Sequence, residues 1–433
     1  MLNIFAGRKP FNEIKKTIAG FAWWQLALMA VAFLYWIKTW FIEGDFDMFI
    51  STCDLLKSRK SIYTPDGIRN LYWYTPTATF LLTPFSYLPS FLYRAIWKGL
   101  NILMLIYGYK ILLKYLPFEG WAGKHRNILL IFTLISTAHF LNLNVAAGQM
   151  TIFMVFACIK ALDDASNGKS KVSAAWLAIA SIIKIMPVVL IPYLLYRGHF
   201  KTIIFYLVFA GLLIVGPAIF FGDYFFGLIV EWKKLVFDDP IAVFYREHAV
   251  IAETLGSVLL TYLSPGTGES PFQSNFLNLD IETVYNIYKI SLLLIISLTL
   301  VILDKCIFKE LKNDKLKLFH FSWLMITVPV IFPMQQKYSY LFLAPAYIFS
   351  IHIIINNFLK AEEKKGNYIL IAFVTISLLL SSVSTMDGLV GFAVKRVSEW
   401  YRFTVFGGII LGGGLLYCKK FFTVAERESF LIK

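Results

Sequence analysis

Three carboxylates stand within five positions at the end of the first long apolar stretch, residues 17–42: Glu43, Asp45 and Asp47. A carboxylate at a membrane surface can act as a general base toward a hydroxyl group of a lipid-borne substrate. Acids at such a place can also simply mark the side of the membrane opposite the positively charged one. Asp45 and Asp47 would project roughly 200° apart on a helix and cannot share one task. Asp45 is therefore either a helix N-cap or free to face a cavity.

Three cations are candidates to face such a carboxylate: Lys184, Lys337 and Arg402. Lys184 lies at the centre of the apolar stretch 172–196, where a charge is costly and usually lies in a cavity or opposite an anion. It either pairs with a carboxylate or carbonyl as a structural group or binds a phosphate. For Lys337 the structural alternative is a lysine that snorkels to the surface. Together the three could stabilise a departing lipid phosphate.

Further polar side chains are expected on the same side, where they would line a substrate site. A lone histidine such as His248 is more often structural than catalytic. The four cysteines are scattered and no metal-ligand spacing is visible, so the sequence predicts no metal site and no cofactor. The expected substrate-binding side chains are Tyr74, Asn144, Gln149, His248 and Gln336.

The composition predicts the setting for these groups. Of 433 residues, 58% are hydrophobic and only 16% are charged, against about 25% in soluble proteins. Apolar runs long enough to cross a bilayer, roughly 20 residues each, recur along the chain. The net charge is +14, and the Lys and Arg residues cluster in short loops between these runs. This distribution is the one expected from the positive-inside rule, and it argues against nucleic-acid binding. We expect one all-α integral-membrane domain over residues 1–433, with no cleaved signal peptide.

The stretch 172–196 decides the topology. It is either one straight span or a hairpin of two short arms broken at Lys184-Ile185-Met186-Pro187. The hairpin places residues 222–283, with nine acids and three bases, outside, and the five lysines of 304–317 inside. The hairpin therefore predicts about twelve membrane helices, two of them short, with cytoplasmic termini and extracytoplasmic segments 43–75 and 222–283.

Several short motifs follow one another along the chain: Asp45-Phe46-x-x-Phe49, Leu55-Leu56, Ile62-Tyr63, Tyr74-Thr75-Pro76, Asn144…Gly148-Gln149 and Lys184-Ile185-Met186-Pro187. Their order resembles that of glycosyltransferase family 87, a branch of the C-type (GT-C) membrane glycosyltransferases. The resemblance covers roughly residues 45–200, with a weaker match through Pro345. It implies a polyprenyl-phosphate-sugar donor, an inverting transfer and Asp45 as the catalytic acidic residue. Where relatives tend to carry histidines in a late outer motif, this chain has Gln335-Gln336-Lys337-Tyr338.

The resulting hypothesis is a hexosyltransferase, with mannose favoured by analogy with mycobacterial relatives. It would act on a lipid- or glycan-linked acceptor at the extracytoplasmic face of a bacterial inner membrane. One carboxylate base suffices because the leaving group is already a phosphate, unlike the paired carboxylates of glycoside hydrolases. The alternative is a transporter or flippase of an anionic lipid or sugar, which the absence of a visible repeat disfavours. A structural assembly subunit would not need Lys184.

Overall fold

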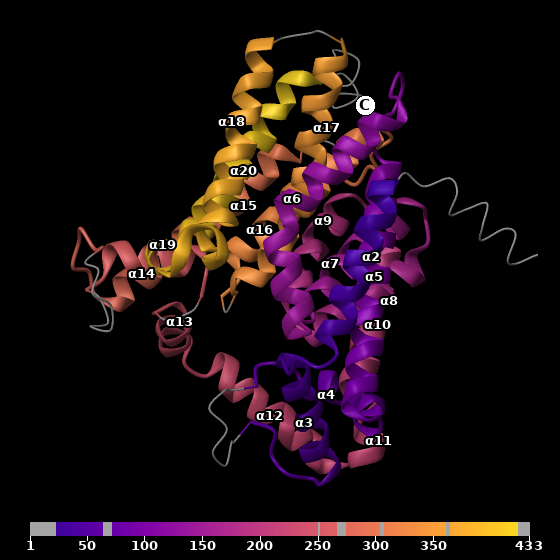
Figure 1. Cartoon of the computed structure of the whole chain (residues 1–433). Coiled ribbons are helices and arrows are strands. Elements are labelled where there is room, and N and C mark those ends of the chain that lie inside the picture. The colour runs from indigo at the N-terminus through magenta and orange to yellow at the C-terminus, as the bar shows by residue number, and fades with distance from the viewer. Residues whose placement is uncertain are drawn as a thin grey trace, which may run out of the picture.

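The computed structural model describes most of the chain, and within the described residues it contains helices and no strand. The all-α prediction is therefore confirmed (Figure 1). The described ranges are 23–63, 72–249, 252–265, 274–303, 307–333, 335–360 and 364–422.

Six helical segments in the described ranges are long and apolar enough to cross a membrane, and a seventh span results if the bent pair α19–α20 counts as one. The two parts of that pair are Asp387–Trp400 and Phe403–Phe421, the second of which is α20 continued by the short helix η5. They meet at 74°. The six segments are Ser90–Lys114, Gly123–Ala147, Phe200–Phe221, Ile281–Ile302, Lys337–Lys360 and Gly366–Thr385.

The predicted count of about twelve spans is not confirmed, because several apolar stretches form shorter helices. Helix α7, Thr151–Ser166, has 16 residues and a length of about 24 Å, less than the roughly 30 Å of a hydrocarbon core. Helix α2 is described over Trp23–Thr39, and the first part of the stretch 17–42 lies outside the described residues. Helix α16, Asp314–Ile331, has three charged residues in its first turn.

The helix breaks at Lys184, as predicted. Helix α8, Ser170–Ile183, ends there, and Lys184 has an extended backbone with φ −147° and ψ 134°. A short 3-10 turn, η2 (Met186–Val189), follows with Pro187 in its first turn, where the missing N–H of proline costs little. Helix α9, Leu190–Tyr196, forms the second arm.

The two outer ends of this hairpin lie at the same end of the molecule. Near the start of α8, the Ser173 hydroxyl donates a hydrogen bond to Ala161 O on α7, at 2.7 Å. Farther along α7, Asp163 accepts a hydrogen bond from Tyr115. The rings of Tyr115 and of Tyr193 on α9 both contact Phe321, at 5.6 and 6.1 Å between centroids. A chain of contacts therefore joins both arms at one end, as a hairpin requires.

The opposite end of the molecule contains helices that lie in or next to the segments 43–75 and 222–283. These two segments were predicted from the sequence to be outside the membrane. Helices α3 and α4 gather there with α11 and α12 (Figure 1). The predicted interfacial helix 46–58 is α3, and its apolar face packs into the main core. The bounds are α3 Asp45–Lys57, α4 Pro76–Leu82, η1 Thr83–Tyr87, α11 Ala218–Phe221 and α12 Asp223–Phe237.

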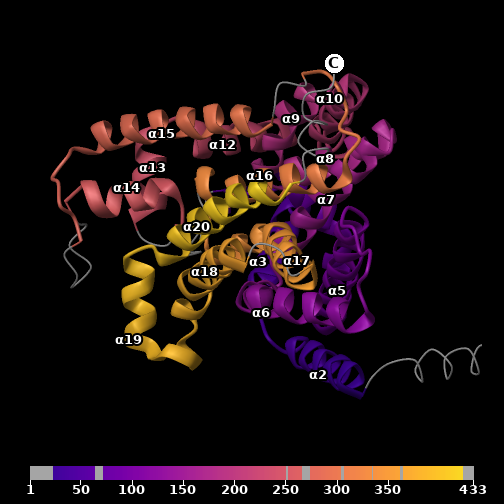
Figure 2. The same ribbon diagram turned by 90° about the horizontal axis from the view of Figure 1, so that it is seen from above.

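The rest of segment 222–283 forms a small second core of its own against helix α15, from Phe244, Leu260, Val284 and Tyr288. Helix α15 runs along one edge of the molecule, while α2 lies at the periphery beside α6 (Figure 2). The remaining elements are α5 Ser90–Lys114, α6 Gly123–Ala147, α10 Phe200–Val215, α13 Pro240–Ala249, α14 Leu255–Leu263, α15 Ile281–Ile302, η3 Lys337–Leu343, α17 Ala344–Lys360, α18 Lys364–Ser381, η4 Val383–Thr385, α19 Asp387–Trp400, α20 Phe403–Tyr417 and η5 Cys418–Phe421.

Candidate active site

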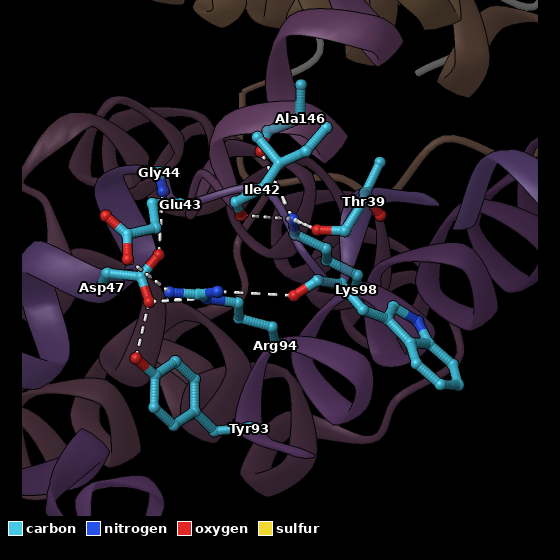
Figure 3. Close-up of polar contacts among 10 residues, drawn as sticks. Thr39, Ile42, Glu43, Gly44, Asp47, Tyr93, Arg94, Lys98 and Ala146 are labelled. Carbon is cyan, nitrogen blue, oxygen red and sulfur yellow. Dashed lines mark hydrogen bonds and ion pairs between the residues drawn. The ribbon is translucent and has the colours of Figure 1, made fainter. Parts of the chain in front are cut away.

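The two aspartates at the start of α3 have different surroundings. Asp47 Oδ1 accepts hydrogen bonds from the Tyr93 hydroxyl at 2.6 Å and from Arg94 Nε at 2.7 Å (Figure 3). Its Oδ2 accepts a hydrogen bond from the backbone N–H of Gly44 at 2.8 Å. Asp47 therefore fixes the first turn of α3 to α5, and both of its oxygens are used in doing so.

Asp45 is the first residue of α3, with Gly44 as the N-cap. It is half-buried, and its Oδ2 accepts a hydrogen bond from Gln149 Nε2. Burial raises the pKa of Asp45 above its ordinary value, while the hydrogen bond from Gln149 opposes that shift. A carboxylate that is harder to ionise is a stronger base once ionised, which suits proton abstraction near neutral pH. Of the two, Asp45 has the surroundings that a base needs.

Two glycines allow the start of α3 to lie directly on the end of α6. A Cβ on Gly44 would come within 2.5 Å of Ala147 O, and one on Gly148 within 2.8 Å of the Phe46 Cβ. Gly148 also has φ 68°, a left-handed conformation that favours glycine. Trp97 completes this contact, since its indole donates to Gly148 O at 2.9 Å and its ring stacks on Phe46. The Gly148-Gln149 motif thus brings Gln149 next to Asp45.

Helix α5 contributes a second buried cation one turn beyond Arg94. Lys98 is 2% exposed, and its ammonium donates to Thr39 O and lies 3.5 Å from Ile42 O and 3.4 Å from Ala146 O (Figure 3). Carbonyls at helix C-termini lack partners within the helix, and a cation there is favourable. Neither Arg94 nor Lys98 was predicted as a site residue from the sequence. Two basic residues four positions apart inside an apolar stretch could have indicated them.

Lys184 lies near the same site. Its ammonium is 3.5 Å from Gln335 Oε1 and 6.0 Å from the centre of the Tyr338 ring. The backbone carbonyl of Tyr338 accepts a hydrogen bond from the fully buried Asn144 at 2.8 Å. Asp45 is close enough to Tyr338 to interact with it electrostatically. Tyr338 therefore connects Asp45, Asn144 and Lys184.

Tyr74 is also in electrostatic range of Asp45. Its ring packs on Phe49 of α3, with 4.7 Å between centroids. Burial raises the pKa of Tyr74 well above its ordinary value, so the phenol stays protonated and is available as a hydrogen-bond donor. The structure thus brings together five of the predicted site residues: Asp45, Tyr74, Asn144, Gln149 and Lys184.

Two cavities border the segment 335–338. The first, about 450 Å³ in volume, has Lys184 and Gln335 among its polar residues. The rest of its wall is almost entirely apolar and aromatic, and we call it the apolar cavity. That wall includes Trp73, Met186, Trp232, Phe244, Tyr285 and Phe332.

The second cavity, about 320 Å³ in volume, is polar, and we call it the polar cavity. Lys337 and Arg402 line it, as does Gln336. Lys337 forms an ion pair with Glu399, and Arg402 donates to Ala252 O at 3.1 Å. The hypothesis that these two cations hold the same phosphate as Lys184 stays a prediction, and the structure places them in a different cavity.

Two acids of the polar cavity, Glu253 and Glu399, were not predicted as site residues. Glu253 belongs to a sequence segment to which no role was assigned, and its position gives no local signal. His248 lies in α13, but its side chain is outside the described residues.

Comparison with known families identifies the chain. The model of glycosyltransferase family 87 matches residues 72–328, more than half of the sequence. The chain belongs to glycosyltransferase family 87. The matched region includes Tyr74, Asn144, Gln149 and Lys184, while Asp45 precedes it and Lys337 and Arg402 follow it. No curated protein and no solved structure matches the chain, so the C-type fold stays a prediction.

Membership in the family makes the protein a glycosyltransferase, and its long apolar helices make it a multi-pass membrane protein. A glycosyltransferase embedded in a membrane fits lipid-linked substrates in general. The donor, the acceptor and the residue roles follow as proposals.

Proposed function

We propose that this glycosyltransferase moves a hexose from a polyprenyl-phosphate donor to a hydroxyl group of a lipid- or glycan-linked acceptor, with inversion at the anomeric carbon. The observation that carries the proposal is the apolar cavity, an apolar and aromatic chamber with Lys184 in its wall. A ligand that matches both features has a long hydrocarbon chain and an anionic head. A polyprenyl phosphate has this chemistry, whereas a nucleotide sugar does not.

Lys184 is proposed to bind the donor phosphate. Charged groups inside a membrane protein usually face a cavity or an anion. The break in the helix leaves Lys184 between two short arms and beside the cavity, not packed along a continuous helix. As the bond between the anomeric carbon and the phosphate oxygen breaks, negative charge grows on the phosphate, and a fixed ammonium stabilises it.

Asp45 is proposed as the general base. It would take the proton of the acceptor hydroxyl while that oxygen bonds to the anomeric carbon and the polyprenyl phosphate departs from the opposite face. Gln149 supports this role because its amide holds Oδ2 of Asp45. Asn144 would act indirectly by holding the backbone of Tyr338.

Charge distribution in the loops supports an active site on the extracytoplasmic face of a bacterial cell membrane, with both termini in the cytoplasm. Asp45 follows the first apolar stretch, and the described residues 307–317, which include four lysines, adjoin the other end of the hairpin, where Phe308 N donates to Tyr196 O. A mannosyl donor is favoured only by family analogy.

The proposal is tested with the purified full-length protein in lipid nanodiscs. Polyprenyl-phosphate mannose, glucose, galactose and arabinose are each supplied with a membrane extract as the source of acceptor, and release of polyprenyl phosphate is measured. We expect one donor to be cleaved, and Asp45→Asn to lower the rate by roughly 10²–10⁴-fold. The neighbouring carboxylate variant Glu43→Gln is the control and should keep most of the activity, since the Glu43 side chain is 86% exposed.

Two results would contradict the proposal. Normal turnover by Asp45→Asn would show that Asp45 is not the general base. Movement of a labelled polyprenyl-phosphate sugar across proteoliposome membranes, with no cleavage of its sugar–phosphate bond, would favour transport instead.

A further inference from the structure

We infer that the polar cavity binds an uncharged saccharide unit through hydrogen bonds centred on Glu253. Its assignment to the acceptor rests on the function proposed above. Lys337 and Arg402, which line this cavity, were predicted to hold the donor phosphate together with Lys184, and the side chains around these two cations argue for a different ligand.

Glu253 is fixed by its backbone and faces the cavity. Its N–H donates to Gln335 O at 2.6 Å, and its carbonyl accepts a hydrogen bond from the Tyr340 hydroxyl at 3.0 Å. Glu253 is one of the residues that line the cavity, although it is only 1% exposed. Among the residues that the structure describes, none forms a hydrogen bond with Oε2 of Glu253. Buried polar atoms normally have a partner, so this oxygen indicates a ligand that supplies one.

The two cations of the cavity already have partners. Lys337 is in direct contact with Glu399, and Arg402 donates to Ala252 O at 3.1 Å. A phosphate entering here would have to compete with Glu399 for Lys337, and its negative charge would lie close to the Glu399 carboxylate. Binding an anion is therefore disfavoured, in contrast to the apolar cavity, where the described wall contains Lys184 and no acid.

Sugar hydroxyls fit this cavity because each one both donates and accepts hydrogen bonds. The lining offers the matching groups: carboxyls, a guanidinium, an ammonium, the Gln336 amide and Tyr338. Burial raises the pKa of Glu253 to about 8, so its carboxyl is largely protonated at neutral pH and can donate as well as accept. A volume of about 320 Å³ lies at the lower end of the roughly 300–1,000 Å³ of ligand pockets, the size for one sugar unit and not for a long lipid.

The position of the cavity favours the acceptor over the donor. Tyr338 lines the polar cavity, and its ring is 6.0 Å from the ammonium of Lys184. The donor proposed for the apolar cavity and the saccharide therefore both lie next to the segment 335–338. Hydrogen bonds link Asp45 to this segment, because Gln149 donates to Asp45 and to Asn144 O, and Asn144 donates to Tyr338 O. An acceptor hydroxyl would have to be deprotonated there.

The test measures binding without turnover. Full-length protein in nanodiscs is titrated with methyl α-mannopyranoside, methyl α-glucopyranoside and methyl α-galactopyranoside, and bound glycoside is detected by saturation-transfer NMR. We expect at least one glycoside to bind, Glu253→Leu to weaken its binding at least tenfold, and Glu253→Gln to stay within about threefold of the natural protein. The amide of glutamine keeps both a donor and an acceptor, and leucine has neither.

Three controls make the result decisive. Glu282→Leu removes an exposed acid of α15 and should leave binding unchanged. Gln336→Leu changes another residue of the cavity wall, should weaken binding, and replaces Glu253→Leu if that variant fails to fold. Inorganic phosphate at 10-fold excess over the glycoside should not displace it.

The inference is overturned if no glycoside binds, if both Glu253→Leu and Gln336→Leu bind as well as the natural protein, or if phosphate displaces the sugar. Failure of the proposed function looks different: glycoside binding and its dependence on Glu253 would persist, but no polyprenyl-phosphate sugar would be cleaved.

Discussion

Gln149 donates a hydrogen bond to Asp45 across 104 positions of the chain. It joins the residue after the C-terminal turn of α6 to the first residue of α3, and the close contact at Gly44 and Gly148 makes it possible. The two residues that the sequence proposed as base and substrate ligand are therefore partners, and the orientation of one depends on the other.

Gln149→Ala should lower kcat by roughly tenfold to a hundredfold, since a misplacement of about 1 Å at a reacting group can cost about 100-fold. It should also move the pH profile. The hydrogen bond from Gln149 lowers the pKa of Asp45, so its loss raises that pKa. Asp45 must be ionised to act, so the fall in kcat/KM on acidification should begin at a higher pH than in the natural protein. A profile with unchanged pH dependence would mean that Asp45 is not the base.

Arg94→Met should destabilise the protein by about 3 kcal/mol, because it leaves Asp47 half-buried without its cation. Thermal unfolding in detergent measures the loss. Lys395→Met is the matched control: it breaks the ion pair with the largely exposed Asp387, a kind worth at most about 1 kcal/mol. Equal losses in the two variants would show that the Arg94–Asp47 pair does not hold α3 in place.

Lys184→Met should raise the KM for the polyprenyl-phosphate donor about tenfold to a hundredfold, the range for a lost hydrogen bond to a charged group. The acceptor KM should stay nearly constant, because the acceptor does not contact Lys184 in the proposed arrangement. Steady-state kinetics with each substrate varied in turn separates the two constants. An unchanged donor KM would make Lys184 a structural residue of the hairpin.

Gly148→Ala tests the contact between α6 and α3. A left-handed conformation costs an L-residue about 1–2 kcal/mol, and the clash with Phe46 adds about 1–3 kcal/mol. Gly168→Ala is the matched control, because Gly168 has φ 72° and open space where a Cβ would be added. This variant should lose only the stability that the left-handed conformation costs. The melting temperature of each variant measures the difference. Equal melting temperatures would mean that the contact between α6 and α3 does not contribute to the stability of the protein.

The sequence by itself determined the class of structure and the position of its main break. Apolar runs require helices in a membrane because each backbone group must find its partner within the segment. Lys184 followed by Pro187 ends a helix for local steric and electrostatic reasons, and the structure breaks there. The number of spans was not determined in this way, because hydropathy does not show where a short helix such as α7 ends or where α19 and α20 bend.

The tertiary structure decided what each charged group does. Asp45 and Asp47 look alike in the sequence, and they differ because Tyr93 and Arg94, more than 40 positions away, occupy Asp47. The separation of Lys184 from Lys337 and the burial of Glu253 likewise depend on contacts between distant segments. Such contacts leave no local pattern, since a hydrogen bond or an ion pair depends on distance in space and not on spacing along the chain.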